Sequence, residues 1–250
     1  MGDSRAVLGT SRPPDQIPCS YNSQFHGNVE LEQMKKRRNS GNCKYIFPVQ
    51  LTFDQKPDLP EEKARVLVCG GKVDRIKNAQ NQPIGPYRVF DSIGQYPGIS
   101  VSRALGDTQL KDSGIISEPV LSTHCLSDDD YFIVVASDGI WDVMDNEDVI
   151  YFVENYRNAC KRKVRASVQG HLVNPANSCI AQMLCEEARV RWFSLIKDED
   201  VNIDDISCVV FEIKDTPIDV KIGKSEVVGK VNESSRRSLV IPISGEYANI

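Results

Sequence analysis

Two short acidic segments, far apart in the chain, have the residue types that hold hard metal ions. In the first, Asp138 and Asp142 lie on either side of Gly139, directly after an apolar run. In the second, Asp204 and Asp205 directly precede another apolar run. Carboxylate oxygens presented at strand ends suit Mg²⁺ or Mn²⁺ better than zinc. The sequence therefore indicates a cation site of the kind that handles phosphate groups.

Both acidic pairs also have a structural interpretation. Asp142 and Asp145 can cap the helix that follows, and Asp204 with Asp205 can form an Asx turn that leads into a strand. Spacing alone favours these structural roles, because acidic pairs are common in caps and turns. The choice between the two interpretations depends on the surrounding sequence.

The two acidic pairs belong to a series of short sequence blocks that follow one another along the chain. The blocks are Leu51–Pro57, Glu62 and Arg65, Gly70–Val73, Arg88–Val89, Ser102–Asp107, Glu118–Pro119, Ser137–Asp142 and Asp204–Ser207. In order and in residue type they resemble the signature blocks of the metal-dependent protein phosphatases, the PPM or PP2C family. With this resemblance, metal binding becomes the preferred role for Asp138 and Asp204.

The resemblance begins at an internal block of the family's domain. Residues Gly2–Arg5 resemble that block, and no Asp-Gly-His occurs in the 250 residues. In the family, the preceding half of the domain supplies an Arg that grips substrate phosphate, a Glu-Asp pair and an Asp-Gly-His-Gly block. We therefore expect residues 1–214 to form the C-terminal part of a PPM-type phosphatase domain, with a polar loop insertion at 10–44. Residues 215–250 are expected to be a C-terminal tail.

The pattern of apolar residues predicts an α+β fold of short strands and a few helices. The predicted strands are 6–8, 45–51, 120–122, 131–136 and 208–213. The predicted helices are 60–67, one that starts at Asp145 or Asn146, and 175–192. Residues 74–100 and 157–174 are predicted to be loops, because Gly and Pro punctuate the first and polar and basic residues dominate the second. The resemblance implies a partial PPM-type β-sandwich of antiparallel sheets flanked by helices, missing its N-terminal strands and helices.

The resemblance also implies a set of metal ligands. Asp138 and Asp204 would bind the first metal of a pair, whereas Asp3, Asp138 and Asp142 would line a weaker third site. The second metal of the pair would take most of its protein ligands from the preceding half of the domain. Mg²⁺ or Mn²⁺ is the expected cofactor, and no residue of this chain is assigned a catalytic role.

A segment with a different expected role is Ser102–Asp107. It lacks the glycine-rich loop of a phosphate cradle. We expect Arg103 and Asp107 to hold neighbouring segments together through a buried hydrogen-bonded network.

Two hypotheses for function remain open. The first is a metal-dependent protein serine/threonine phosphatase that hydrolyses phosphoserine and phosphothreonine, impaired in this truncated chain. The second is a catalytically inactive PPM-like binding or regulatory module. In both, strands missing from the sandwich would leave sheet edges exposed for pairing with another chain.

Composition limits the environment in which the protein works. The formal net charge of −5 gives no case for nucleic-acid binding, and no apolar run reaches the length of a membrane span. The cysteines are scattered without CxxC spacing, so we expect core thiols rather than disulfides or zinc ligands. We expect a cytoplasmic or nuclear protein whose partners are phosphoprotein substrates, with neither nucleic acid nor membrane among them.

Overall fold

The fold is seen in a computed structural model of the chain, which describes residues 2–12, 45–93, 98–168, 179–195, 203–213 and 239–240. The chain divides into two compact units. Unit 1 comprises the described residues of Met1–Ser4 and Thr52–Ser122, and unit 2 those of Arg5–Leu51 and Thr123–Val240. Within the described ranges, no helix combines the length and the apolar character that a membrane span requires.

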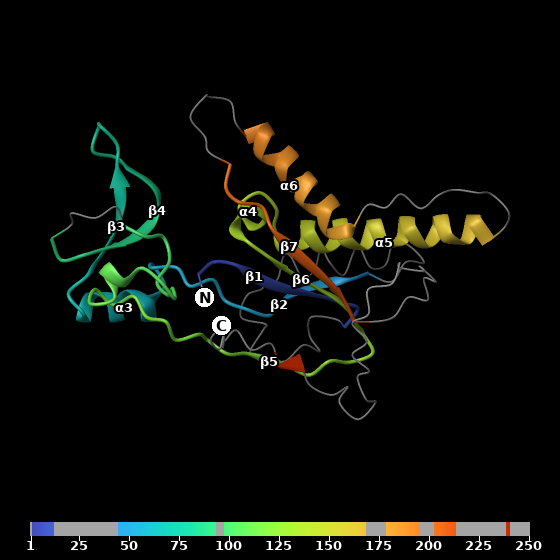
Figure 1. The fold of residues 1–250 in the computed structure, drawn as a ribbon, viewed down its shortest axis with the longest axis horizontal. Coiled ribbons are helices and arrows are strands. Elements are labelled where there is room, and N and C mark those ends of the chain that lie inside the picture. The colour runs from blue at the N-terminus through green and yellow to red at the C-terminus, as the bar shows by residue number, and fades with distance from the viewer. Residues whose placement is uncertain are drawn as a thin grey trace, which may run out of the picture. The chain divides into compact units, whose positions relative to one another are not determined.

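Unit 2 is built on a four-stranded antiparallel sheet with the strand order β2-β1-β6-β7 (Figure 1). The strands are β1 (Arg5–Thr10), β2 (Phe47–Gln50), β6 (Asp130–Ala136) and β7 (Cys208–Glu212). Each coincides with an apolar, β-branched or aromatic run of the sequence, which favours a pleated and largely buried surface. The four corresponding strand predictions are confirmed.

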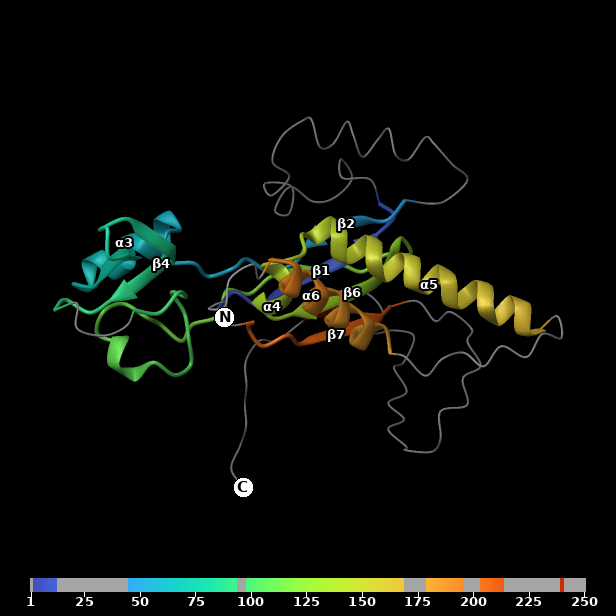
Figure 2. The ribbon, with the colours of Figure 1, turned by 90° about the horizontal axis from the view of Figure 1, so that it is seen from above.

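Helices cover one face of this sheet. The helices α5 (Asn146–Val168) and α6 (Ile180–Leu195) lie over the strands, and the short α4 (Asp138–Trp141) follows β6 directly (Figure 2). The buried core between these layers contains Val7, Phe132, Val134, Ala136, Ile140, Val149, Ile150, Val153, Leu184 and Ala188. Full burial of each large apolar side chain contributes about 1.5–3 kcal/mol. The unit therefore depends on strands and helices that come from both ends of the sequence.

The helix α5 begins as the sequence predicts and ends later. The Asp145 carboxylate accepts a hydrogen bond from the Asp148 amide at 2.7 Å, so Asp145 caps the helix. The prediction of a loop from residue 157 is wrong, because α5 continues to Val168. The Lys, Arg and Ala residues of this stretch are strong helix formers, and their helix propensity decides its structure although their polarity indicates a loop.

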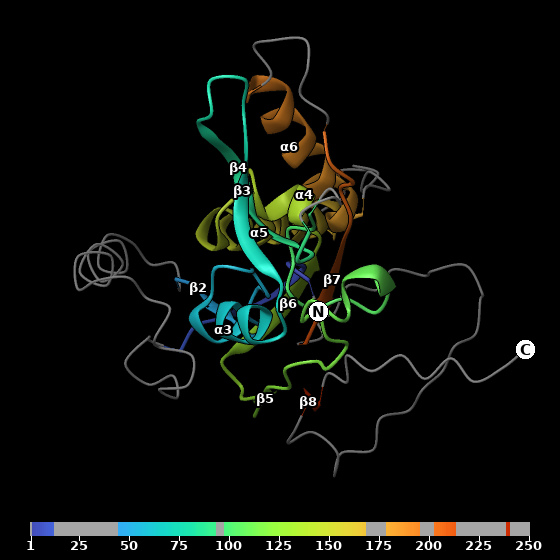
Figure 3. The same cartoon turned by 90° about the vertical axis from the view of Figure 1, so that its left-hand side faces the viewer.

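Unit 1 has a smaller core beneath a long ribbon. It contains α3 (Pro60–Val68), β3 (Lys72–Lys77), β4 (Pro83–Phe90) and the 3₁₀ turn η2 (Thr108–Leu110), and Figure 3 shows α3 at one end of the β3–β4 ribbon. The core residues of this unit are Val66, Val89, Leu110 and Ile115. The prediction of a helix at 60–67 is confirmed.

The ribbon itself contradicts the prediction of a loop over 74–100. Arg75 lies opposite Tyr87, whereas Ile76 lies opposite Ile84, so Gly85 and Pro86 form a bulge in β4. Gly85 has φ +67°, a conformation that glycine adopts without strain. The residues that indicate a loop in the sequence are therefore the residues that let an antiparallel ribbon bend.

Other predictions fall partly or wholly outside the described residues. The strand expected at 120–122 is not found there; β5 (Thr123–His124) begins three residues later and pairs with β8 (Leu239–Val240). Most of the predicted loop at 10–44 and of the predicted tail at 215–250 lies outside the described ranges, as do residues 175–178. With antiparallel sheets and helices in both units, the α+β class is confirmed.

Replacement of Gly9 by alanine tests the tight packing at the centre of the sheet. The new Cβ would lie 2.7 Å from Cζ of Phe132, whose fully buried ring also lies 4.9 Å from the Arg157 guanidinium. We expect Gly9→Ala to lower the free energy of unfolding by about 1–3 kcal/mol in urea titrations. In a Phe132→Leu background, which removes the clashing ring atoms, the same change is expected to cost clearly less. An equal cost in both backgrounds would contradict this packing.

Candidate metal-binding site

The two acidic segments meet where β6 ends and β7 begins. Ala136 and Cys208 are paired in the antiparallel register, and the Ser137 amide donates to the Ser207 carbonyl at 3.0 Å. The Ser207 amide donates in turn to Oγ of Ser137 at 3.1 Å. Residues that are 70 positions apart in the sequence are thereby held together at one end of the sheet.

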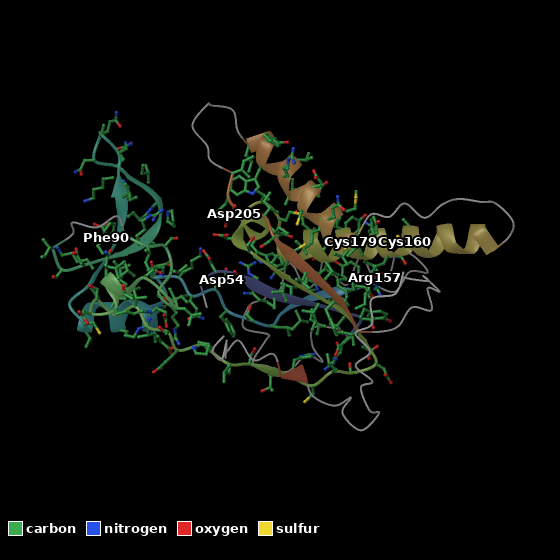
Figure 4. The ribbon with its side chains drawn as sticks, in the orientation of Figure 1. Asp54, Phe90, Arg157, Cys160, Cys179 and Asp205 are labelled. Carbon is green, nitrogen blue, oxygen red and sulfur yellow. The ribbon has the colours of Figure 1, made fainter. Side chains whose placement is uncertain are left out.

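A close backbone approach completes this junction. Oγ of Ser137 donates to the Asp205 carbonyl at 2.8 Å, and Asp205 lies beside α4 in Figure 4. The same carbonyl oxygen would lie only 2.5 Å from a Cβ added to Gly139. Glycine is therefore required at position 139 because of this contact, and the sequence offers no separate signal for it.

The predicted metal ligands of unit 2 lie on the two sides of this junction. Asp138 is the first residue of α4, and its carbonyl accepts from the Asp142 amide at 2.9 Å. Asp138 is partly exposed, whereas Asp142 and Asp204 are exposed. Oδ1 of Asp204 accepts from the Asp205 amide at 2.8 Å, one residue on, whereas the predicted Asx turn would be closed by the amide two residues on. A carboxylate has about four lone-pair sites, so this hydrogen bond is compatible with a cation ligand.

Two indole groups fix α4 behind the acidic residues. Nε1 of Trp141 donates to the Ala136 carbonyl at 2.9 Å, and Nε1 of Trp192 donates to the Gly139 carbonyl at 2.7 Å. The guanidinium of Arg5 lies 5.1 Å from the centre of the Trp141 ring. Because these bonds satisfy the indole N–H groups of the buried Trp141 and the partly exposed Trp192, the turn that carries Asp138 is anchored to both β6 and α6.

Asp3, the fourth predicted ligand, belongs to unit 1. Its carboxylate forms an ion pair with the ammonium of Lys56. Its segment is held by the Gly2 amide, which donates to the Arg103 carbonyl at 3.1 Å, and by the Gly2 carbonyl, which accepts from the Gln55 amide at 2.8 Å. A metal ion at Asp3 would therefore compete with a lysine for the same carboxylate.

The ligand set that this chain offers is partial. In the ranges that the structure describes, no three His, Cys, Asp or Glu side chains lie close enough to hold a metal ion. Mg²⁺ is commonly bound through one or two carboxylates while it retains several waters, and Asp138 and Asp204 offer oxygen donors of that kind at adjoining strand ends. These residues fit a weakly held Mg²⁺ or Mn²⁺, and their metal-binding role remains a prediction.

A second polar cluster, in unit 1, surrounds the buried carboxylate of Glu62. It accepts from Arg65 at 2.6 and 2.8 Å, from Nη2 of Arg103 at 2.6 Å and from Oγ of Ser102 at 2.5 Å. Glu62 is 3% exposed. Burial alone would raise its pKa, but the hydrogen bonds from Arg65, Arg103 and Ser102 outweigh burial and lower the pKa to about 2.

The expectation for Arg103 is confirmed, and that for Asp107 is not. Arg103 joins Glu62 to the Glu118 carbonyl, to which Nη1 donates at 3.0 Å. Asp107 is exposed at the start of η2, where its carbonyl accepts from the Leu110 amide at 2.9 Å. The buried partner of Arg103 is therefore Glu62, which the sequence places 41 residues away.

The fold and this junction define an α+β protein with aspartates at the adjoining ends of two antiparallel strands. The family model described as Protein phosphatase 2C matches residues 1–189 of the chain. The chain belongs to the protein phosphatase 2C family.

Relatives and solved structures agree with this assignment. The "Probable protein phosphatase 2C 72" of Arabidopsis thaliana is 30% identical over 217 residues, which are 87% of this chain and 50% of that protein. The "Probable protein phosphatase 2C 48" of Oryza sativa subsp. japonica is 34% identical over 172 residues, or 68% of this chain and 40% of that protein. The crystal structure of serine-threonine phosphatase 2C from Toxoplasma gondii has the same fold, with a TM-score of 0.55 and 22% identity over 86% of this chain and 53% of that one. The chain thus spans about half the length of these proteins or less.

Replacement of Gly139 by alanine tests the contact between the two acidic segments. Because the clashing atom is a backbone oxygen of Asp205, side-chain rotation cannot relieve the overlap. We expect Gly139→Ala to lower the free energy of unfolding by about 1–3 kcal/mol and to speed hydrogen exchange at the Ser207 amide. Gly106→Ala is the control, since a Cβ at Gly106 meets no atom within 4 Å. Unchanged exchange at Ser207 would show that the two segments are not held by this contact.

The Glu62 cluster predicts acid sensitivity. Since the folded-state pKa of Glu62 is about 2 and its ordinary value is 4.5, its stabilisation is complete above pH 4.5 and is lost as the pH falls towards 2. The linked free energy is roughly 3 kcal/mol. In urea titrations between pH 6 and pH 2.5, the wild type is expected to lose more stability than Glu62→Gln, which has no carboxylate to protonate. Parallel pH profiles of the two proteins would rule out this role for Glu62.

Proposed function

We propose that this chain functions as part of a metal-dependent protein serine/threonine phosphatase, which hydrolyses phosphoserine and phosphothreonine with Mg²⁺ or Mn²⁺. The observation that carries the proposal is the junction of Ser137–Asp142 with Asp204–Ser207, which places Asp138 and Asp204 at adjoining strand ends. Family membership supports it, because the two relatives compared above are named as probable protein phosphatases.

The chemistry of phosphate-ester hydrolysis accounts for the residue types at this junction. Bound divalent cations supply positive charge against the phosphoryl oxygens and acidify water at neutral pH. In this proposal Asp138 and Asp204 hold one cation, and Asp142 contributes to a weaker neighbouring site. Ser137 and Gly139 act indirectly, because their contacts with Asp205 and Ser207 set the spacing between the two acidic segments.

The extent of the chain bears on how much activity it has by itself. It spans 40% and 50% of the two relatives compared above. Two carboxylates are fewer than a two-metal centre needs, so we expect the isolated chain to hydrolyse phosphate esters slowly. A two-metal centre would need ligands in addition to Asp138 and Asp204.

A sheet edge in the described part of the chain favours a second candidate, a binding module without activity. Among the described strands, β7 is the last in the order β2-β1-β6-β7, and Val209 and Phe211 on it are 63% and 53% exposed. An edge strand with exposed apolar side chains can pair with another chain. In this alternative the acidic junction would stabilise the fold without supporting turnover.

Mn²⁺ binding and hydrolysis together distinguish these candidates. Free Mn²⁺ is titrated with the full chain and followed by its electron paramagnetic resonance signal, and turnover of p-nitrophenyl phosphate and a phosphothreonine peptide is measured in parallel. We expect Asp138→Asn and Asp204→Asn to weaken Mn²⁺ binding by at least about tenfold. Asp128→Asn, at an exposed aspartate before β6, is the matched control and should bind as the wild type does.

The outcomes separate the two functions. Slow turnover that requires Mn²⁺ and disappears in Asp138→Asn supports the phosphatase. Mn²⁺ binding by the wild type that is no stronger than in Asp138→Asn, with equal turnover in the two proteins, contradicts the phosphatase and favours the binding module.

A further inference from the structure

Two cysteine thiols from different elements are in direct contact in unit 2. Sγ of Cys185 in α6 lies 3.6 Å from Sγ of Cys208 in β7, and both thiols are free. The Cys208 thiol also donates to the Ala181 carbonyl at 3.3 Å. Because Ala181 lies one helical turn before Cys185, the Cys208 side chain rests against that turn of α6.

We propose that Cys185 and Cys208 form a dithiol that hydrogen peroxide oxidises to a disulfide joining α6 to β7. The site is independent of the proposed metal centre and of phosphatase activity. It also goes beyond the expectation that the cysteines are core thiols.

The geometry favours this pairing. A disulfide has an S–S distance of about 2.05 Å, so the two sulfur atoms need to approach by roughly 1.5 Å. Side-chain rotation can supply a movement of this size, because rotation about each Cα–Cβ bond moves the attached sulfur. Both residues are partly exposed, so a small oxidant can reach them without unfolding of the unit.

The environment also decides the order of the two steps. Burial first, and the neighbouring Cys185 second, raise the pKa of Cys208 to about 12. Cys208 therefore remains a neutral thiol near pH 7, and we assign it the second step, with Cys185 as the initial nucleophile.

The reaction is balanced with one peroxide molecule. The Cys185 thiolate attacks one oxygen, the O–O bond breaks, and a sulfenic acid forms while the released hydroxide takes a proton to become water. The Cys208 sulfur then attacks the Cys185 sulfur and gives its proton to the departing hydroxide, which leaves as a second water. Two thiols lose two electrons in total, and the peroxide gains them.

Cys179 is the cysteine that could compete with Cys185 for a disulfide with Cys208. It is exposed at the start of α6, and Figure 4 labels it beside Cys160 of α5. Burial, followed by these two thiols, raises the pKa of Tyr156, so Cys160 and Cys179 both lie close to that ring. Cys185 is favoured over Cys179 because its sulfur is in direct contact with that of Cys208.

Peptide mapping of the full chain tests the proposal. The reduced protein is treated with hydrogen peroxide, remaining thiols are alkylated, and tryptic peptides are identified by mass spectrometry with and without a reductant. We expect a reducible link between the peptides that contain Cys185 and Cys208, and a loss of two titratable thiols. The link should persist in Cys179→Ser and disappear in Cys185→Ser and in Cys208→Ser.

Two results would overturn the proposal. A link to Cys208 that survives in Cys185→Ser but is lost in Cys179→Ser would show that Cys208 pairs with Cys179 and not with Cys185. Oxidation of Cys185 to sulfinic acid without any link to Cys208 would show that the two sulfurs do not react with each other. Circular dichroism of each variant before oxidation checks that a missing link does not result from a lost fold.

Discussion

The acidic junction depends on the hydroxyl group of Ser137. It donates to the Asp205 carbonyl and accepts from the Ser207 amide, so one small side chain satisfies two backbone groups of the opposite segment. Exposed loops at strand ends usually leave such groups to water. Here they are fixed to β6, and the absence of a side chain at Gly139 lets the segments approach closely. The spacing between the two acidic segments is therefore set by these hydrogen bonds and backbone contacts, and not by contacts between the acidic side chains.

The Glu62 cluster has the corresponding place in unit 1. The core of that unit contains only a few large apolar side chains in the described residues, among them Val66 and Val89. A buried carboxylate with three side-chain donors binds α3 to the segment of Ser102 and Arg103. Partially satisfied, such a group would destabilise the fold, whereas full satisfaction makes the arrangement specific. In this unit, polar contacts supply part of the stabilisation that apolar packing supplies in unit 2.

The sequence predicted most strands because their apolar runs are buried in the sheet, as in β6, where Phe132 and Val134 are fully buried. It failed where a local signal has two physical meanings. Gly85 and Pro86 indicate a loop but lie in a bulge of the ribbon, and basic residues after Arg157 indicate a loop but extend α5.

The site was predictable to a similar, limited degree. Carboxylates at strand ends, Asp138 and Asp204, follow directly from the position of the apolar runs. Their relation to each other does not, because it requires the register between β6 and β7 and the Ser137 hydrogen bonds across 70 residues. The pairing of Asp3 with Lys56 was also not indicated, since Lys56 lies 53 residues away. Metal binding by the four aspartates remains a prediction.

The strand order has a consequence for how the protein is made. The central pair of the sheet, β1 and β6, joins distant parts of the chain, as the hydrogen bond between Ser11 and Asp129 over 118 residues shows. At a synthesis rate of about 5–20 residues per second, β1 leaves the ribosome roughly 6–24 s before its partner does. During that interval the β1–β2 hairpin exposes an edge that β6 will later cover. Val7 and Leu8, which are fully buried in the folded protein, are still exposed to solvent. The nascent chain is therefore most exposed to aggregation, and most in need of a chaperone, well before the acidic junction exists.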